Sequence, residues 1–205
     1  MKIFSIIGVS QSGKTTTIEA IIAELRRRGY SVGSIKEIHY EQFAIDTEGS
    51  NTVRHRKAGS QLVTARGYYE TDILYPSKLP VDEILAHYDF DYAALEGVSD
   101  IPVPTIICAH SEQEVEERLS QQCFAVSGRI ADKQYRVCGL PAISVMQDAV
   151  ALTDLIEQKA AAYRPEAAYC YHSAQYIKVA DGAAGRLLQR LFGDADEIVL
   201  RRIGK

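Results

Sequence analysis

Residues 8–15 constrain the fold of this chain more than any other segment. They read Gly-Val-Ser-Gln-Ser-Gly-Lys-Thr and fill every fixed position of the phosphate-binding pattern G-x-x-x-x-G-K-[ST]. The apolar run before them, residues 2–7, is typical of a short buried strand. Residues 15–28 after them place Ile18, Ile21 and Leu25 at helical spacing. The sequence therefore predicts strand, phosphate-binding loop and helix in that order.

The residue types of this loop suit a bound triphosphate. Gly8 and Gly13 allow backbone N–H groups to turn inward around an anion, and the N-terminus of the following helix adds the positive end of its dipole. Lys14 is expected to contact the β- and γ-phosphates as a catalytic residue, and the Thr15 hydroxyl to coordinate Mg²⁺. Further backbone or hydroxyl donors to the nucleotide are expected from Ser10, Gln11, Ser12 and Thr16.

Two acidic residues are candidates for the metal site. Asp46 lies in a polar loop after a second predicted strand, where it could hold Mg²⁺ opposite Thr15 or act as an ordinary turn aspartate. Glu96 ends a predicted buried strand, residues 91–97, at the edge where open α/β sheets present their ligands. We expect Glu96 to bind Mg²⁺ or to position a water molecule for catalysis, the alternative being a carboxylate that caps the next element.

A dense basic cluster follows Asp46. Ser50 is a plausible N-cap for a short helix, on which Arg54 and Lys57 share a face at i, i+3 and could bind a second anionic group. The alternative is a solvated charged face. Beyond this helix, residues 61–66 and 69–75 are two β-prone runs that predict a hairpin or an edge excursion from the main sheet.

The order of elements predicts an α/β protein with the three-layer P-loop NTPase fold, that is, a mostly parallel sheet with helices on both faces. Residues 1–163 are expected to form the nucleotide-binding domain and residues 164–205 a C-terminal extension packed on it. A net charge of −4 argues against nucleic acid as a partner. No apolar run approaches the roughly 20 residues that span a bilayer, so we expect a cytoplasmic protein with no membrane partner.

Three stretches together resemble the molybdopterin-guanine dinucleotide biosynthesis protein B family, called MobB. The first is the phosphate-binding loop. The second runs from Ile35-Lys36-Glu37-Ile38-His39 through residues 46–59 and is similar to the family's Lys-His, Asp-x-x-Gly-Lys-Asp-Ser and Arg-Lys-Ala-Gly pattern. The third, residues 94–97, resembles its Val-Glu-Gly strand end. The chain differs at Glu37, where the family usually has histidine, and at residues 50–52, where Ser-Asn-Thr replaces Lys-Asp-Ser.

The resemblance implies a function. Members of that family bind GTP, hydrolyse it slowly, form homodimers and assist the guanylyltransferase that attaches GMP to molybdopterin. The resemblance thus implies that GTP and Mg²⁺ are cofactors of this chain. It also implies that the guanylyltransferase and the pterin are its partners. A preference for guanine rests on the resemblance alone, because no [NT]-K-x-D segment follows a late strand, and ATP remains an alternative.

Two other functions fit the same loop. In a small-molecule kinase the loop would bind ATP, and Arg54, Lys57 and Arg66 would hold the phosphate acceptor. In a non-hydrolysing, nucleotide-gated scaffold the nucleotide would only control the binding of a partner.

Overall fold

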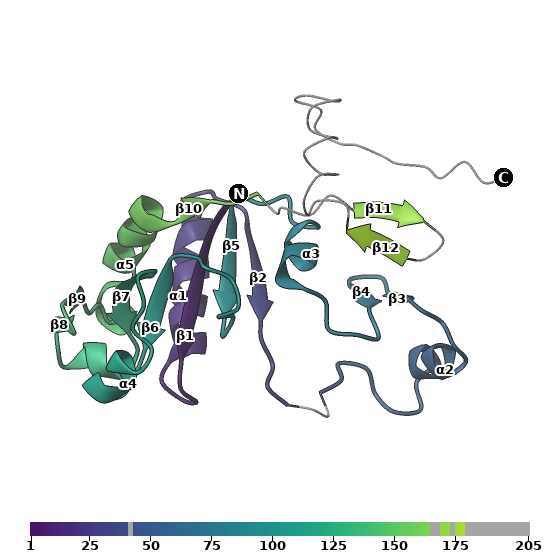
Figure 1. Ribbon diagram of the computed structural model, residues 1–205, viewed down its shortest axis with the longest axis horizontal. Helices are drawn as coiled ribbons and strands as arrows, with labels where there is room; N and C mark the ends of the chain where they lie inside the picture. Colours follow the sequence, from purple (N-terminus) through teal and green to yellow (C-terminus); the bar gives the residue numbers. More distant parts are fainter. Residues whose placement is uncertain (41–42, 165–168, 173–174, 179–205) are drawn as a thin grey trace, which may run out of the picture. The chain divides into compact units, whose positions relative to one another are not determined.

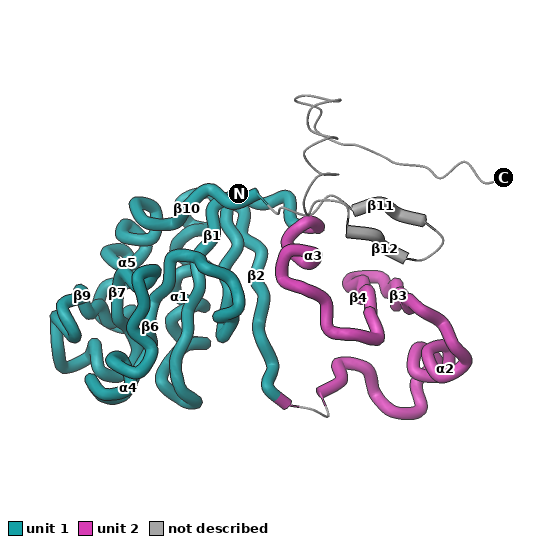
Figure 2. The backbone as a smooth tube through the Cα atoms, in the orientation of Figure 1, with its two compact units in different colours: residues 1–39, 88–164 teal, residues 40–87, 165–205 magenta. Residues whose placement is uncertain are grey.

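The computed structural model describes residues 1–40, 43–164, 169–172 and 175–178. The chain forms two compact units, shown in different colours in Figure 2. Residues 1–39 and 88–164 form the first unit, and residues 40–87 and 165–205 the second.

The first unit is built on a parallel sheet with the strand order β2-β5-β1-β6-β7 (Figure 1). Its strands are β1 (Lys2–Gly8), β2 (Val32–Lys36), β5 (Tyr92–Glu96), β6 (Thr105–Cys108) and β7 (Cys123–Ser127), and β10 (Ala161–Ala162) pairs antiparallel with the start of β1. The chain leaves β1 towards β2 on one side and returns to β6 on the other side. The carboxyl end of β1 is therefore the point where the strand order reverses, which is where sheets of this kind bind ligands.

Helices cover both faces of this sheet. The helices of the first unit are α1 (Lys14–Arg27), α4 (Glu112–Glu116), the 3₁₀ helix η1 (Arg129–Asp132) and α5 (Val145–Lys159), and a short hairpin joins β8 (Arg136–Val137) to β9 (Leu140–Pro141). Phe4 and Ile6 of β1 pack with α1 and α5 in one hydrophobic cluster. Ile107 and Val126 pack with α4 and η1 in another. Strand residues buried on alternate faces thus explain the three layers.

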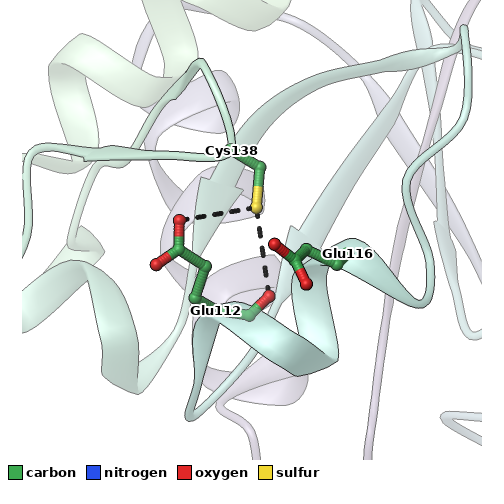
Figure 3. Close-up of side chains that lie close together, drawn as sticks. All are labelled: Glu112, Glu116 and Cys138. Atoms are coloured by element: carbon green, nitrogen blue, oxygen red, sulfur yellow. Dashed lines mark hydrogen bonds between the residues drawn. The ribbon is translucent and has the colours of Figure 1, made fainter.

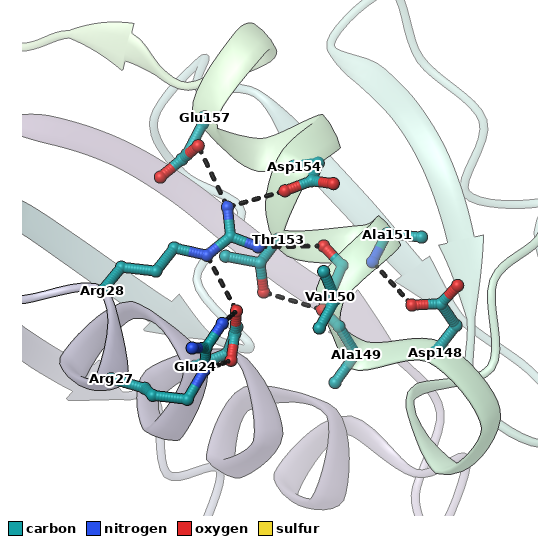
Figure 4. Close-up of polar contacts among 10 residues, drawn as sticks. All are labelled: Glu24, Arg27, Arg28, Asp148, Ala149, Val150, Ala151, Thr153, Asp154 and Glu157. Carbon is teal, nitrogen blue, oxygen red and sulfur yellow. Dashed lines mark hydrogen bonds and ion pairs between the residues drawn. The ribbon is translucent and has the colours of Figure 1, made fainter.

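A polar network joins α1 to α5 (Figure 4). The Arg28 guanidinium lies 2.8 Å from the Glu24 carboxylate, and on α5 it lies 2.7 Å from Asp154 and 3.0 Å from Glu157. Arg27 also donates to Glu24, so hydrogen bonds from Arg27 and Arg28 lower the pKa of Glu24 to about 2. The network links α1 to α5, the two helices that cover one face of the sheet.

The second unit contains α2 (Asn51–Lys57), a hairpin of β3 (Val63–Arg66) and β4 (Thr71–Leu74), and α3 (Val81–Leu85). The Ser50 side chain accepts a hydrogen bond from the Val53 backbone N–H, as expected of an N-cap. The strands β11 (Tyr169–His172) and β12 (Gln175–Lys178) pair antiparallel.

These elements confirm the predicted parallel sheet, the strand-loop-helix order, the Ser50 cap and the hairpin. The predicted C-terminal extension, residues 164–205, lies mostly outside the described residues, and its packing stays a prediction. Within the described part of the chain, every helix is too short or too polar to cross a membrane.

Candidate functional site

The phosphate-binding loop connects β1 to α1 in a conformation that depends on its glycines. Gly8 has φ +151° and Gly13, the N-cap of α1, has φ +101°, while Gln11 between them adopts φ +59°. A Cβ atom on Gly8 would lie 2.0 Å from the Cys108 carbonyl oxygen, so the loop leaves β1 in close contact with β6. Helix α1 begins at Lys14, and the N–H groups of its first turn have no carbonyl one turn earlier in the helix to bind. The loop therefore presents backbone donors at the carboxyl end of β1.

Gly128 supports this loop from the end of β7. A Cβ atom at Gly128 would lie 2.2 Å from the Ser12 carbonyl oxygen, and the residue has φ 76° and ψ −158°. The Arg129 backbone N–H donates to the same Ser12 carbonyl at 3.2 Å. The Ser12 side chain is buried and donates to the Val9 carbonyl at 2.9 Å. The conformation of the loop is thus held by direct backbone contact with the two residues that follow β7.

Lys14, Thr15 and Glu96 converge above the end of β1. The Lys14 ammonium donates to the Val9 carbonyl within the loop. The Thr15 hydroxyl donates to Glu96 Oε1 at 2.8 Å. The ammonium of Lys36, at the end of β2, lies 3.1 Å from the same Oε1 and 3.4 Å from Thr15 Oγ1. The side chain of Glu96 is only 8% exposed, and its carboxylate accepts from the Thr15 hydroxyl and the Lys36 ammonium.

A cavity of about 590 Å³ opens over this group. Its volume is in the range of small-molecule sites. All of its lining residues belong to the first unit: Ile7, Gly8, Ser10, Gln11, Lys14, Thr15, Lys36, Glu37, His39, Glu96, Gly97, Ser99 and Arg118. Of the loop residues predicted to bind the nucleotide, Gly8, Ser10 and Gln11 thus line the cavity, whereas Ser12 is buried outside its lining and Thr16 is exposed on the first turn of α1.

The oxygen atoms of this site fit a magnesium ion. Mg²⁺ prefers hydroxyl and carboxylate oxygens. Thr15 Oγ1 and Glu96 Oε1 lie 2.8 Å apart, and both residues line the cavity. Thr15 and Glu96 are therefore the residues of this unit that would hold the ion.

The other predicted site residues belong to the second unit. Asp46 accepts hydrogen bonds from the Ser50 hydroxyl at 2.7 Å and the Thr47 backbone N–H at 2.9 Å, just before α2. Hydrogen bonds from the Thr52 and Ser50 side chains lower the pKa of Asp46. These contacts order the start of α2, and a role of Asp46 in binding metal stays a prediction.

Arg54 and Lys57 lie on α2. Arg54 donates to the Asn51 side chain at 3.4 Å, and Lys57 forms an ion pair with Glu48. Their binding of a nucleotide or of a second anion stays a prediction.

Several residues of the site were absent from the sequence-based candidates, among them Lys36, His39, Arg118 and Gly128. Lys36 was detectable in principle, because it ends β2 and lies in the stretch that resembles the MobB pattern. His39 lies in the same stretch, whereas the local sequence of Arg118 carries no comparable signal, although both residues line the cavity.

A second group of potential ligands lies apart from the cavity (Figure 3). Ligand atoms of Glu112, Glu116 and Cys138 lie within 4.8 Å of one another. The Cys138 thiol donates weakly to the Glu112 carboxylate at 3.8 Å. Burial and the charges of Glu112 and Glu116 raise the pKa of this thiol, whereas a metal ligand must be a thiolate. These contacts are those of a protonated cysteine.

Comparison with known proteins agrees with this architecture. The crystal structure of Bacillus subtilis MobB superposes with a TM-score of 0.65 at 23% identity and covers 80% of this chain and 100% of that one. A MobB protein homolog from Bacillus stearothermophilus gives a TM-score of 0.58 at 20% identity, covering 77% of this chain and 97% of that one. At these identities the structures establish the fold.

Sequence comparison identifies the family. A probable molybdopterin-guanine dinucleotide biosynthesis adapter protein of Bacillus subtilis is 24% identical over 160 residues, which are 76% of this chain and 92% of the relative. The adapter protein of the same name from Haemophilus influenzae is 32% identical over 115 residues, which are 54% of this chain and 64% of the relative. Residues 3–128, more than half of the chain, match the family described as Molybdopterin guanine dinucleotide synthesis protein B. The chain therefore belongs to the MobB family.

Proposed function

We propose that this protein is a cytoplasmic GTP-binding adapter with weak GTPase activity that acts with the guanylyltransferase of molybdopterin guanine dinucleotide biosynthesis. The observation that carries the proposal is the convergence of Lys14, Thr15 and Glu96 on one cavity at the end of β1. The adapter role rests on the family and on the names of its relatives.

The residues of the loop are arranged to receive a triphosphate. The Lys14 ammonium has a carbonyl of its own loop as partner, a contact that it can exchange for phosphate oxygens. The N–H groups at the start of α1 and the dipole of its 14 residues favour an anion at the same place. A bound Mg²⁺ would neutralise the negative charge of the phosphates. The Thr15 hydroxyl and the Glu96 carboxylate supply its protein ligands in this proposal.

Glu96 is also the candidate for positioning the attacking water. Its carboxylate is buried and already accepts from Thr15 and Lys36. Glu96 also lines the cavity, so its carboxylate can accept a hydrogen bond from a water molecule there, and we expect it to orient that water for attack.

Nucleotide binding is tested by titrating fluorescently labelled GTP and ATP against the parent and Lys14→Ala. We expect the parent to bind GTP more tightly and Lys14→Ala to lose binding while its melting temperature is unchanged, because the variant removes a charged contact from a surface loop. Equal affinity of parent and variant would show that the loop is not the nucleotide site.

The kinase alternative is tested on the same protein by comparing phosphate release with phosphate transfer to candidate acceptors. Slow release without transfer supports the GTPase, transfer supports the kinase, and binding with neither supports the scaffold. The adapter role predicts that the purified guanylyltransferase binds the chain, which calorimetry measures directly. The pterin is titrated in the same way.

A further inference from the structure

Lys36 occupies a special position in the sheet. Strands β2 and β5 are parallel neighbours, and their register pairs Lys36 with Glu96. The ladder continues beyond this pair, since the Glu37 backbone N–H donates to the Glu96 carbonyl at 2.8 Å. The backbone thus holds the lysine directly opposite the buried carboxylate, and both residues line the cavity.

The Lys36 ammonium contacts the two oxygen atoms that would bind the metal. It lies 3.1 Å from Glu96 Oε1 and 3.4 Å from Thr15 Oγ1, and these oxygens lie 2.8 Å from each other. The other two cations of the cavity have different partners among the described contacts. Lys14 donates to the Val9 carbonyl, and Arg118 donates to the Glu114 carbonyl and the Glu117 carboxylate.

Glu96 needs such a partner. A carboxylate whose side chain is only 8% exposed is costly to bury unless a cation or hydrogen-bond donors compensate it. The Lys36 side chain is 55% exposed and flexible, so its ammonium can leave this position at little cost. The pair therefore joins a fixed buried anion to a movable cation.

We propose that Lys36 is a built-in counter-ion that competes with the divalent cation for Glu96 and Thr15. A divalent ion and an ammonium cannot share these two oxygens, because like charges a few ångströms apart repel strongly where water is limited. The free protein thus binds the metal weakly. When a triphosphate enters the cavity, Lys36 turns to the phosphate oxygens and releases both metal ligands. Metal and nucleotide consequently bind with positive coupling. This coupling rests on the proposed nucleotide function, whereas exclusion of the metal from the free protein does not.

The test uses Mn²⁺ as a spectroscopic probe for Mg²⁺ and the variants Lys36→Met and Lys36→Arg. Lys133→Met is the matched control, since it removes one exposed lysine charge outside the cavity. Free Mn²⁺ is measured by electron paramagnetic resonance without nucleotide, and melting temperatures verify folding. We expect Lys36→Met to bind Mn²⁺ about 3- to 10-fold more tightly than the parent, the size of one lost partly exposed charge pair. Lys36→Arg and Lys133→Met should match the parent.

A second measurement compares labelled-GTP affinity in EDTA and in Mg²⁺. Lys36→Met should bind more weakly than the parent in EDTA, because it lacks the ammonium that the metal-free phosphates attract. The gain in affinity on adding Mg²⁺ should be smaller for Lys36→Met than for the parent, because the metal ligands of the variant are free before the nucleotide binds and the coupling is reciprocal. An equal or larger gain would overturn the coupling.

Equal Mn²⁺ binding by the parent and Lys36→Met, including no binding by either, overturns the proposal. Tighter Mn²⁺ binding by Lys36→Arg as well would also overturn it, because the positive charge would then not be the cause. If no protein binds GTP, the proposed nucleotide function and the coupling fail, and the Mn²⁺ measurement still decides whether Lys36 excludes the metal.

Discussion

Gly128→Ala should damage the phosphate-binding loop from below. The added Cβ would lie 2.2 Å from the Ser12 carbonyl oxygen and 3.1 Å from the Ala109 backbone nitrogen. Both neighbours are backbone atoms, so no side chain can rotate away. Either the end of β7 or the loop itself must move.

The cost has two sources. With φ 76° and ψ −158°, Gly128 adopts a conformation that is essentially restricted to glycine, and forcing another residue into it costs roughly 1–3 kcal/mol. Overpacking against a rigid neighbour adds roughly 1–3 kcal/mol. We therefore expect Gly128→Ala to lower the free energy of unfolding by about 2–6 kcal/mol. Displacement of Ser12 should also weaken the binding of labelled GTP by about tenfold or more, roughly 1.4 kcal/mol.

Gly139→Ala is the matched control, because Gly139 also has positive φ, at +80°, but no atom within 4 Å of the added Cβ. It should cost about 1 kcal/mol and leave nucleotide binding unchanged. Urea unfolding at pH 7 measures both variants, and labelled-GTP titration measures the effect on the loop. If Gly128→Ala is no less stable than Gly139→Ala, contact between β7 and the loop does not determine the loop's conformation.

Three further predictions concern other parts of the chain. Hydrogen bonds lower the pKa of Glu24 from 4.5 to about 2, so the stability that Glu24 contributes is present above pH 4.5 and lost as pH falls towards about 2. Glu24→Gln should therefore be less stable than the parent at pH 7 in urea unfolding, with a difference that closes over this acidic range, and a pH-independent difference would refute the assignment. Asp46→Asn and Glu96→Gln should each weaken the Mg²⁺ dependence of GTP binding, and parental Mg²⁺ titrations of both variants would show that the metal is held without them. Ile73 on β4 is 57% exposed, and we expect the β3–β4 hairpin to form a homodimer contact. Ile73→Lys should therefore shift the protein towards monomer in light scattering over a concentration series. A parent protein that is already monomeric at tens of micromolar would contradict the dimer.

The sequence was sufficient to predict the loop and the strands that carry it. Gly8, Gly13 and Lys14 stand at fixed spacings within eight residues, so local chemistry determines their conformation. The buried strand that ends at Glu96 could likewise be predicted, because it is an uninterrupted apolar run followed by an acid and a glycine. The loop and this strand could be predicted because each is determined by residues adjacent in the sequence.

Gly128 could not be assigned a role in this way. It follows β7 and precedes η1, and a glycine in such a position usually marks only a turn. Its contact with Ser12 joins positions more than a hundred residues apart, which meet because α1 begins beside the end of β7. Neither the register of β7 nor the path of the loop follows from the sequence around Gly128.

The role that we propose for Lys36 depends even more directly on the order of the strands. In the sequence, Lys36 follows the phosphate-binding loop by more than twenty residues and precedes Glu96 by sixty. The two residues face each other because β5 lies between β1 and β2, so the strand that ends at Glu96 has the loop on one side and Lys36 on the other. If β2 were instead adjacent to β1, the lysine would pair with the loop, and the Glu96 carboxylate would need another cation. In the proposed function the motif determines where a phosphate binds, and the strand order determines which cation lies beside the Glu96 carboxylate.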